Sequence, residues 1–302
     1  MSGRLECVPN ISDGRRPTEI AAIAAAFASG GAALLDTDSD VDHNRTVIAI
    51  AGTVEQVIEG AVRGVREARD RIDLRRHQGA HPRMGATDVV PFVPLGGATM
   101  ADAVAAAERA AGRIWSELGV PVYLYGEAAR RPERRNLAAV RKGQFEGIRD
   151  TIGVDPARRP DVGEAAVHPS AGITAVGARF FLVAYNVNLA TRDLDVAKRI
   201  AKEIREKDGG LRAVKAMGFD LPEQGLVQVS MNLVDFRLTS PIEVFDVIAA
   251  KARAAGVEVA GSEVVGLIPE EAAPEGFRER VEAHDFDADE QVIERRLARA
   301  GA

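Results

Sequence analysis

Residues 46–72 read TVIAIAGTVEQVIEGAVRGVREARDRI, and the spacing of apolar residues changes within this stretch. Thr46–Ala51 is rich in β-branched residues, which favours an extended strand. Residues 53–56 (TVEQ) fit a capping box, in which the threonine hydroxyl and the glutamine amide bond free backbone amides of a first helical turn. From there the apolar residues recur every three or four positions, namely Val54, Val57, Ile58, Val62, Val65 and Ile72. The stretch therefore predicts a strand that leads into a helix starting at Thr53.

The alternation of strands and helices continues on both sides of this stretch. Before it we expect a strand at Leu5–Val8, a helix at Arg16–Ser29 and a strand at Ala32–Leu35. After it we expect a strand at Val89–Val93, a helix at Met100–Leu118 and a strand at Val120–Tyr125. An arginine-rich stretch punctuated by glycines, from Arg130 to Gly177, separates these elements from the second half of the chain.

From Phe180 the same order of elements starts again. We expect strands at Phe180–Asn188, Ala213–Phe219, Gly225–Leu238 and Val257–Leu267, with helices at Leu194–Lys207 and Ile242–Ala255. An order of strand-helix-strand-strand-helix-strand is typical of a ferredoxin-like sandwich. We therefore predict an α+β fold of two ferredoxin-like (βαββαβ) subdomains, residues 1–179 and 180–302, with antiparallel sheets and helices on one face. The charged stretch Glu270–Ala302 is expected to form a helical, solvated tail.

Composition excludes several classes of protein. The 302 residues are 46% hydrophobic, which suffices for two packed cores and excludes a wholly disordered chain. The 39 Lys and Arg against 45 Asp and Glu give a net charge of −6, which disfavours nucleic acid as a partner. Cys7 is the single cysteine, so an internal disulfide framework is excluded. No signal peptide or membrane span is evident, and we expect a soluble, cytoplasmic protein.

The common nucleotide-binding and hydrolase motifs are also missing. We find neither Gly-x-Gly-x-x-Gly nor a P-loop, which removes most support for a nucleotide cofactor. His-Glu-x-x-His and Gly-x-Ser-x-Gly are absent as well, and no metal site is predicted. Chemistry near neutral pH then depends on the histidines, which are His43, His77, His81, His168 and His284.

The segment from Arg75 to Asp88 (RRHQGAHPRMGATD) is the strongest candidate for a site. Pro82 favours an extended backbone at His81, while Gly79 and Gly85 allow the chain to approach a ligand closely. Arginine forks bind carboxylates in bidentate geometry, and an imidazole beside them can act as a base. The segment therefore suits an anionic substrate held next to a base. The alternative is a surface loop whose charges have no function.

Three other polar stretches are candidates for parts of a site. Residues 36–45 (DTDSDVDHNR) contain alternating aspartates but lack the glycine and glutamate of an EF-hand, so a polar turn with site residues is favoured over calcium. Residues 123–130 (YLYGEAAR) end a predicted strand, where Glu127 or Arg130 can reach a site. The alternative is the end of a strand whose tyrosines pack in the core and have no role in a site. Residues 163–172 (GEAAVHPSAG) form a loop near the junction of the halves, where ligands often bind.

Several of these motifs resemble the glutamate formiminotransferase family. They are residues 6–10 (ECVPN), 44–46 (NRT), 77–85 (HQGAHPRMG), 120–130 (VPVYLYGEAAR) and 229–233 (VSMNL). Their common order makes coincidence improbable, and the resemblance runs from about Glu6 to about Ile268. Members of this family transfer the formimino group of N-formimidoyl-L-glutamate to N5 of tetrahydrofolate, a late step of histidine breakdown. The resemblance implies two ferredoxin-like subdomains with a substrate cleft between them.

The resemblance also implies roles for particular residues. His81 corresponds to the catalytic histidine, and the folate-binding segment falls on Gly163, Glu164, Ala165, Ala166, Val167, His168, Pro169, Ser170, Ala171 and Gly172. Val167 and Ala171 stand where the mammalian form has aromatic residues. Tetrahydrofolate is implied as co-substrate, without a metal or a permanently bound cofactor. A homodimer is a further family-level expectation, and because no cyclodeaminase domain follows, a separate cyclodeaminase is expected for the next step.

We predict that His81 acts as general base and then as general acid, with Asp38 orienting its ring. Arg45, Arg76 and Arg83 are predicted to bind the carboxylates of the two substrates, and Glu127 to lie at the site. Two other functions fit the same residues. One is a folate-binding module without catalysis, and the other is a hydrolase that transfers the formimino carbon to water.

Overall fold

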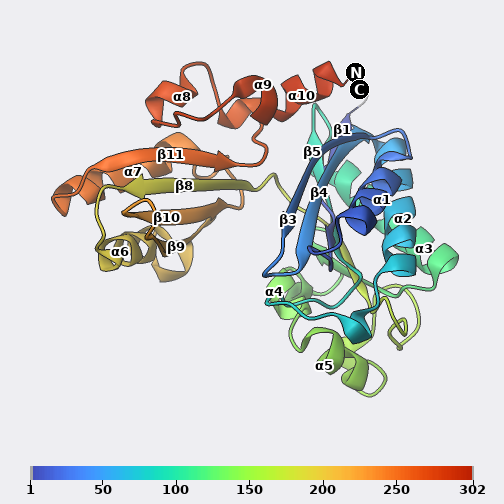
Figure 1. The fold of residues 1–302 in the computed structure, drawn as a ribbon. Helices are drawn as coiled ribbons and strands as arrows, with labels where there is room; N and C mark the ends of the chain where they lie inside the picture. Colours follow the sequence, from blue (N-terminus) through green and yellow to red (C-terminus); the bar gives the residue numbers. More distant parts are fainter. Residues whose placement is uncertain (1–2, 301–302) are drawn as a thin grey trace. The chain divides into compact units, whose positions relative to one another are not determined.

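The computed structural model describes residues 3–300, which separate into two units. The first unit comprises residues 3–179 and the second unit residues 180–300. Both combine a β-sheet with helices, so the fold is α+β (Figure 1). Within the described residues, no helix is long and apolar enough to cross a membrane.

A single sheet forms the centre of the first unit. Its strands are β1 (Arg4–Cys7), β2 (Asn10–Ile11), β3 (Ala33–Asp40), β4 (Arg45–Thr53), β5 (Thr87–Leu95), β6 (Val122–Gly126) and β7 (Thr174–Ala178). β3 pairs with β4, the short strands β1 and β2 both lie between β4 and β5, and β7 and β6 follow. β7 runs parallel to both β5 and β6, whereas the other pairs are antiparallel. The predicted antiparallel sheet is therefore wrong for this unit.

Three long helices cover one face of this sheet, namely α1 (Pro17–Ala28), α2 (Val54–Arg71) and α3 (Met100–Leu118) (Figure 1). The capping box at the start of α2 is confirmed, because the Thr53 side chain accepts a hydrogen bond from the Gln56 amide. Glycines allow α1 and α2 to approach each other closely. A Cβ at Gly60 would lie 2.2 Å from the Phe27 carbonyl, and one at Gly64 would lie 2.2 Å from the Phe27 ring.

Two short helices, α4 (Leu137–Val140) and α5 (Gln144–Thr151), lie in the stretch before β7. Val140 and Ile148 belong to a separate apolar cluster with Tyr123 and Tyr125 of β6. The neighbours Val122 and Leu124 face the core under α1–α3, so this second cluster lies on the opposite face of the sheet. The prediction of helices on one face only is wrong here, because the arginine-rich stretch contributes a second helical layer.

The second unit contains an antiparallel sheet with the order β11-β8-β10-β9. Its elements follow the chain as β8 (Val183–Leu189), α6 (Leu194–Ile204), β9 (Val214–Leu221), β10 (Leu226–Leu233), α7 (Pro241–Ala254) and β11 (Val259–Val265). α6 and α7 pack on the face that carries buried Tyr185, Val187, Val229 and Met231. This is the predicted order of strands and helices.

The last described residues of the second unit pack along β11. They form α8 (Phe277–Arg280), α9 (Ala288–Gln291) and α10 (Ile293–Arg299), which run beside β11 (Figure 1). The Ser262 amide of β11 donates to the Glu282 carbonyl at 3.0 Å. Phe277 and Ile293 are 2% and 0% exposed. The expected solvated tail is therefore wrong, since apolar residues at helical spacing anchor it.

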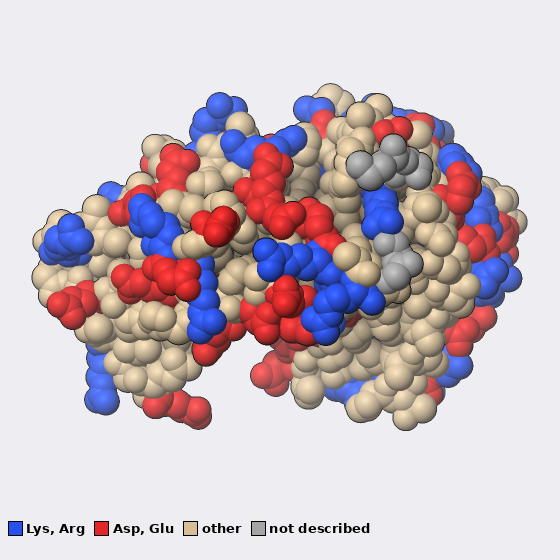
Figure 2. All heavy atoms as spheres, turned by 90° about the horizontal axis from the view of Figure 1, so that it is seen from above, with Lys and Arg blue, Asp and Glu red and all other residues tan. Residues whose placement is uncertain are grey.

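Acidic and basic side chains are intermixed over the molecular face in Figure 2, where they form small groups rather than one extended basic area. The first unit contains many ion pairs, such as Arg109 with Glu55 and Arg113 with Glu59. Exposed pairs of this kind contribute little to stability.

Candidate functional site

The loop that carries His81 is fixed on the turn between β3 and β4. The amides of Ala80 and His81 donate to the carbonyls of Asp42 and His43, each at 3.3 Å. The Asn44 side chain donates to the Gln78 carbonyl at 2.8 Å. A Cβ at Gly79 would lie 2.5 Å from the His43 carbonyl oxygen, so the close approach of the two segments requires glycine there. These contacts hold His81 at 6% exposure.

Asp88, at the start of β5, is the carboxylate beside His81. Its Oδ2 lies 3.6 Å from Nε2 of His81 and 2.6 Å from Nη2 of Arg141. Its Oδ1 accepts a hydrogen bond from the Met84 amide at 2.8 Å. Complete burial raises the pKa of Asp88, but interactions with His81, Arg141 and the Met84 amide outweigh burial and hold that pKa below its ordinary value. The carboxylate is therefore ionised and fixed in place.

Asp38 does not have the predicted position against the His81 ring. It is exposed on β3, and no contact joins it to His81 within residues 3–300. The strand register pairs Asp38 with Val47, Asn10 with Val47, and Asp40 with Arg45. Side chains of paired residues share a face, so Asp38 lies with Asn10 and Arg45 on the face opposite α1–α3. In the described structure, Asp88 and not Asp38 lies beside the ring, with its Oδ2 3.6 Å from Nε2.

The predicted arginines have different environments. Arg83 is 7% exposed and is held by Glu146 through two hydrogen bonds of 2.6 and 2.8 Å, so this guanidinium is already paired with a carboxylate. Arg76 is exposed, and its side chain has no hydrogen bond or ion pair with any described residue. Arg45 is half-buried, and its Nε has no partner. Glu127 is exposed and pairs with Arg135 at 3.1 Å.

A cavity of about 340 Å³ lies beside Arg76 and His77. Its remaining lining residues are Ser12, Asp13, Arg16, Asn44, Arg71, Ile72 and Asp73. Nε2 of His77 lies 3.0 Å from the Asn44 carbonyl and carries the proton in that contact, which leaves the buried Nδ1 without a partner. Burial lowers the pKa of His77, and the charge of Arg83 adds to this effect. The cavity is therefore lined by the unpaired guanidinium of Arg76 and the ring of His77, together with the carboxylates of Asp13 and Asp73.

The second half of segment 163–172 folds as a tight turn that supports the His81 loop. His168 and Gly172 exchange two backbone hydrogen bonds of 2.9 Å, and Nδ1 of His168 accepts from the Ala171 amide at 3.1 Å. The Ala86 amide donates to the Ala171 carbonyl at 2.8 Å. Val167 packs against the core and Ala171 is 2% exposed, so both side chains point inward. Residues 163–166 are exposed.

Unpartnered buried polar atoms gather in this part of the first unit. They are Nε of Arg45, Nδ1 of His77, Nε2 of His81, Nε of Arg83 and Oγ1 of Thr87. Buried polar groups normally have hydrogen-bond partners, and leaving one unpaired costs about 1–3 kcal/mol. Unpaired polar atoms of this kind are expected at a site that binds a polar ligand, so they favour this part of the first unit as the candidate site.

Two family models cover nearly the whole chain. The formiminotransferase domain, N-terminal subdomain, matches residues 4–179, and the formiminotransferase domain matches residues 184–297. The chain belongs to the formiminotransferase family. The family boundary lies close to the division between the two units at residues 179 and 180.

Proteins from a bacterium, an archaeon and an animal are similar in sequence to this chain over long stretches. The glutamate formimidoyltransferase of Streptococcus pyogenes serotype M1 is 44% identical over 98% of this chain and 99% of its own. The Thermoplasma acidophilum protein of the same name is 40% identical over 98% of each chain. The formimidoyltransferase-cyclodeaminase of Sus scrofa is 45% identical over 89% of this chain, which corresponds to 51% of the pig protein.

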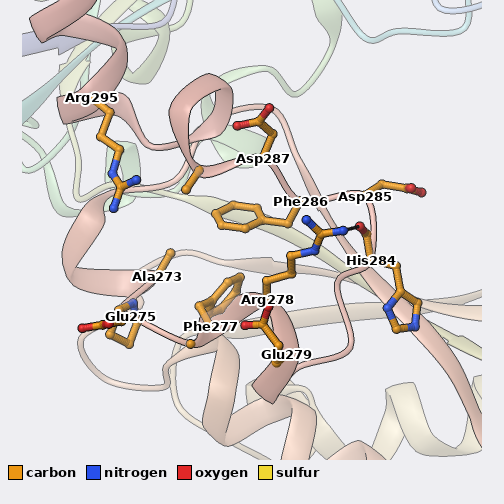
Figure 3. Close-up of a pocket in the computed structure, with 13 residues that line it drawn as sticks. Ala273, Glu275, Phe277, Arg278, Glu279, His284, Asp285, Phe286, Asp287 and Arg295 are labelled. Carbon is orange, nitrogen blue, oxygen red and sulfur yellow. Dashed lines mark hydrogen bonds between the residues drawn. The ribbon is translucent and has the colours of Figure 1, made fainter.

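A larger cavity in this formiminotransferase, about 570 Å³, lies in the second unit between α8 and α10 (Figure 3). Phe277 and Phe286 meet edge to face with centroids 5.2 Å apart, and Arg278 donates to the His284 carbonyl. The acidic residues Glu275 and Asp287 also line it. None of the motif residues quoted from the sequence lies here, so the cavity is not the candidate site.

The sequence analysis placed His77 and Asp88 in the candidate segment 75–88 without giving either a role, and it named neither Arg141 nor Glu146. Asp88 had one available signal, since it is a charged residue at the start of the apolar run of β5. A carboxylate in such a run needs a buried partner. Arg141 and Glu146 had no comparable signal, because they reach the site from α4 and α5, which were not predicted.

Proposed function

We propose that this chain transfers the formimino group of N-formimidoyl-L-glutamate to N5 of tetrahydrofolate, giving 5-formimidoyltetrahydrofolate and L-glutamate. The observation that carries the proposal is the match of both units to the formiminotransferase family, with the relative of Streptococcus pyogenes aligned almost end to end. The buried His81 within the matching motif supports it, because hydrogen bonds hold its loop to the turn between β3 and β4 and its ring lies 3.6 Å from the carboxylate of Asp88.

His81 is the proposed general base and acid. Attack of N5 on the amidine carbon forms a tetrahedral centre, and His81 accepts the proton that N5 loses. The bond from that carbon to the glutamate nitrogen then breaks, and His81 returns the proton to this nitrogen. A positioned base of this kind contributes about 100- to 10,000-fold in rate.

Asp88 is the proposed orienting group. A carboxylate facing Nε2 favours the tautomer with the proton on Nε2 and leaves Nδ1 to accept the proton from N5. The 3.6 Å separation is longer than a hydrogen bond and would shorten in the working complex, as catalytic contacts commonly do on substrate binding. Arg141 and the Met84 amide hold the carboxylate in the required orientation.

The substrate carboxylates are assigned to the guanidinium groups that lack protein partners. Arg76 at the 340 Å³ cavity and Arg45 on the open sheet face fit this role. Arg83 acts through its ion pair with Glu146, which holds α5 against the His81 loop. We assign the exposed residues 163–166 to folate contact and the rest of the segment, through Gly172, to support of the loop.

We infer that both units are ferredoxin-like. The strand order of the second unit, β11-β8-β10-β9, supports this, as does the order β5-β1-β4-β3 within the larger first sheet. A substrate cleft between the subdomains, a homodimer, a cytoplasmic location and a separate cyclodeaminase partner stay predictions.

The decisive experiment measures free glutamate released from formiminoglutamate with and without tetrahydrofolate. Release that depends on tetrahydrofolate, with a matching amount of 5-formimidoyltetrahydrofolate, is the expected result. Release without tetrahydrofolate would indicate a hydrolase. Binding of both compounds without release would indicate a folate-binding module.

A further inference from the structure

The loop that carries His81 is attached to the rest of the first unit at both of its ends. At one end, Nδ2 of Asn44 donates to the Gln78 carbonyl at 2.8 Å. At the other end, Oγ of Ser12 donates to the Gly85 carbonyl at 2.7 Å. Between them, the hydrogen bond from the His81 amide to the turn between β3 and β4 is longer, at 3.3 Å. The two ends are therefore held more closely than the middle of the loop.

The side-chain amide of Asn44 joins these two attachments. Its Oδ1 accepts a hydrogen bond from the Gly14 amide at 2.9 Å, and Gly14 lies two residues after Ser12. Through Asn44, the Gln78 end of the loop is thus connected to the same short segment that holds the Gly85 end. The amide has one possible orientation, because the Gly14 amide can only donate and the Gln78 carbonyl can only accept.

The backbone at this position restricts which side chain can make both hydrogen bonds. Asn44 has a φ of +51°, a conformation that asparagine tolerates better than most residues with a side chain. It is 8% exposed, and its own carbonyl accepts a hydrogen bond from Nε2 of His77 at 3.0 Å. Asparagine combines one donor and one acceptor on a short side chain, whereas aspartate lacks the donor and glycine lacks both.

We propose that Asn44 is a positioning residue for the reaction, which places the His81 ring by fixing the two ends of its loop relative to each other. Within the described residues, no hydrogen bond joins the Asn44 side chain to the ring, so the effect is transmitted through the loop. A displacement of about 1 Å at a reacting group can cost about 100-fold in rate. This inference rests on the proposed function, because it takes His81 as the group that moves the proton.

The first test measures amide hydrogen exchange over residues 78–85, which does not depend on catalysis. Asn44→Asp keeps the acceptor for the Gly14 amide but loses the donor to Gln78. Asn44→Gly tolerates the positive φ and loses both hydrogen bonds. We expect exchange over the loop to be at least tenfold faster in both variants, with exchange in α6 unchanged. Glu282→Gly is the matched control, because Glu282 is exposed in the second unit and has a φ of +53°.

The second test is a double-mutant cycle between Asn44 and His81, measured in single turnovers at saturating substrate. Asn44→Asp should lower the rate constant for transfer about 100-fold in the otherwise wild-type protein. In His81→Ala the same change should cost less than twofold, because the ring that Asn44 positions is absent. Ser12→Ala, which releases only the other end of the loop, should give the same pattern with a loss of at least threefold.

These measurements separate the inference from the proposed function. The inference is overturned if Asn44→Asp costs the same factor with and without His81, since the residue then acts on the fold alone. Unchanged exchange over the loop in both Asn44 variants would overturn it as well. Wild-type protein that releases no glutamate, although Asn44→Asp loosens the loop, would instead contradict the proposed function.

Discussion

Asp88 illustrates how a single buried residue constrains the candidate site. A carboxylate with 0% exposure is costly unless it is both paired and hydrogen bonded, and Asp88 has the Met84 amide, Arg141 and His81 around it. Removing one member of such a group leaves the others buried without compensation. The same contacts that stabilise the fold therefore also determine the orientation of His81.

Asp88→Asn should impair both stability and catalysis. Loss of one partner of a buried ion pair costs about 3–5 kcal/mol, and loss of a group that orients a histidine costs about 10- to 100-fold in activity. The pKa of Asp88 is lowered in the folded state, so its stabilising contribution is complete above the ordinary pKa of about 3.9 and disappears as the pH falls through the folded-state value. Urea unfolding at neutral and acidic pH checks this: the difference between variant and wild type should shrink below about pH 4. A difference independent of pH would contradict it.

His81→Ala should lower kcat by about 100- to 10,000-fold, the contribution of a positioned general base, while substrate binding is retained. Steady-state kinetics together with calorimetric binding of both substrates checks this. His284→Ala is the matched control, because His284 is exposed and its side chain makes no hydrogen bond within the described residues. A kcat for His81→Ala within about tenfold of wild type would show that another group moves the proton.

At the residue scale, the sequence identified the loop that carries His81 but not all of the residues that contact it. Pro82, Gly79 and Gly85 indicated a loop that presents His81, and the structure holds this loop to the turn between β3 and β4 by hydrogen bonds. Asp38 was predicted to orient the ring because a carboxylate on the second ring nitrogen fixes the tautomer, but the residue lies on a strand whose register keeps it away from His81. Asp88 is joined to His81 because residues 81–88 fold back on themselves, and composition alone does not predict such a reversal.

At the scale of elements, the turn 168–172 links the segment assigned to folate with the His81 loop. Its geometry depends on Nδ1 of His168 as an acceptor and on Gly172, whose φ of +71° favours glycine. Burial lowers the pKa of His168, and the charge of Arg69 lowers it further, so the neutral acceptor form is favoured. The folded-state pKa lies below the unfolded value, so the stabilisation is complete above about pH 6.5 and is lost as the pH falls through the folded-state pKa.

His168→Ala should therefore raise the KM for tetrahydrofolate and lower the free energy of unfolding by about 1–2 kcal/mol, because two backbone amides lose their acceptor. His168→Asn provides the comparison, since an asparagine oxygen can accept from amides two and three residues later. Recovery of the KM by asparagine but not by alanine would support a role in shaping the turn. Equal KM values in both variants and wild type would contradict it.

The elements that were predicted correctly have strong local signals. α2 combines a capping box with an apolar stripe over 18 residues, and its packing on the sheet follows from that stripe. By contrast, β7 (TAVGA) was not predicted. It is short and consists mostly of small residues, and its position depends on parallel pairing with β5 and β6. α4 has 4 residues and α5 has 8, so neither is long enough for an apolar stripe to recur over several turns. These elements depend on tertiary contacts that a local pattern does not contain.

At the scale of the whole molecule, net charge and local charge have opposite signs. The chain carries −6 overall, which repels anionic substrates at long range. The proposed contacts are nevertheless guanidinium groups without side-chain partners, such as Arg76 and Arg45 in the first unit. The exposed arginines along α2 and α3 are mostly held in ion pairs, so a count of charges from the sequence does not identify which ones remain free.

The dependence of KM on salt decides which of these charges controls substrate binding. If repulsion by the net charge dominated, added salt would screen it and lower the KM for formiminoglutamate. Direct contact with Arg76 predicts the opposite, a KM that rises a few-fold between about 0.05 and about 0.5 M KCl, because at the higher concentration the Debye length is only about 4 Å. kcat should stay constant, since the proton transfer at His81 involves no long-range charge. In Arg76→Gln the KM should be higher at low salt and nearly independent of KCl. If the KM falls with added salt in both proteins, long-range repulsion by the net charge controls binding, and Arg76 does not contact the substrate.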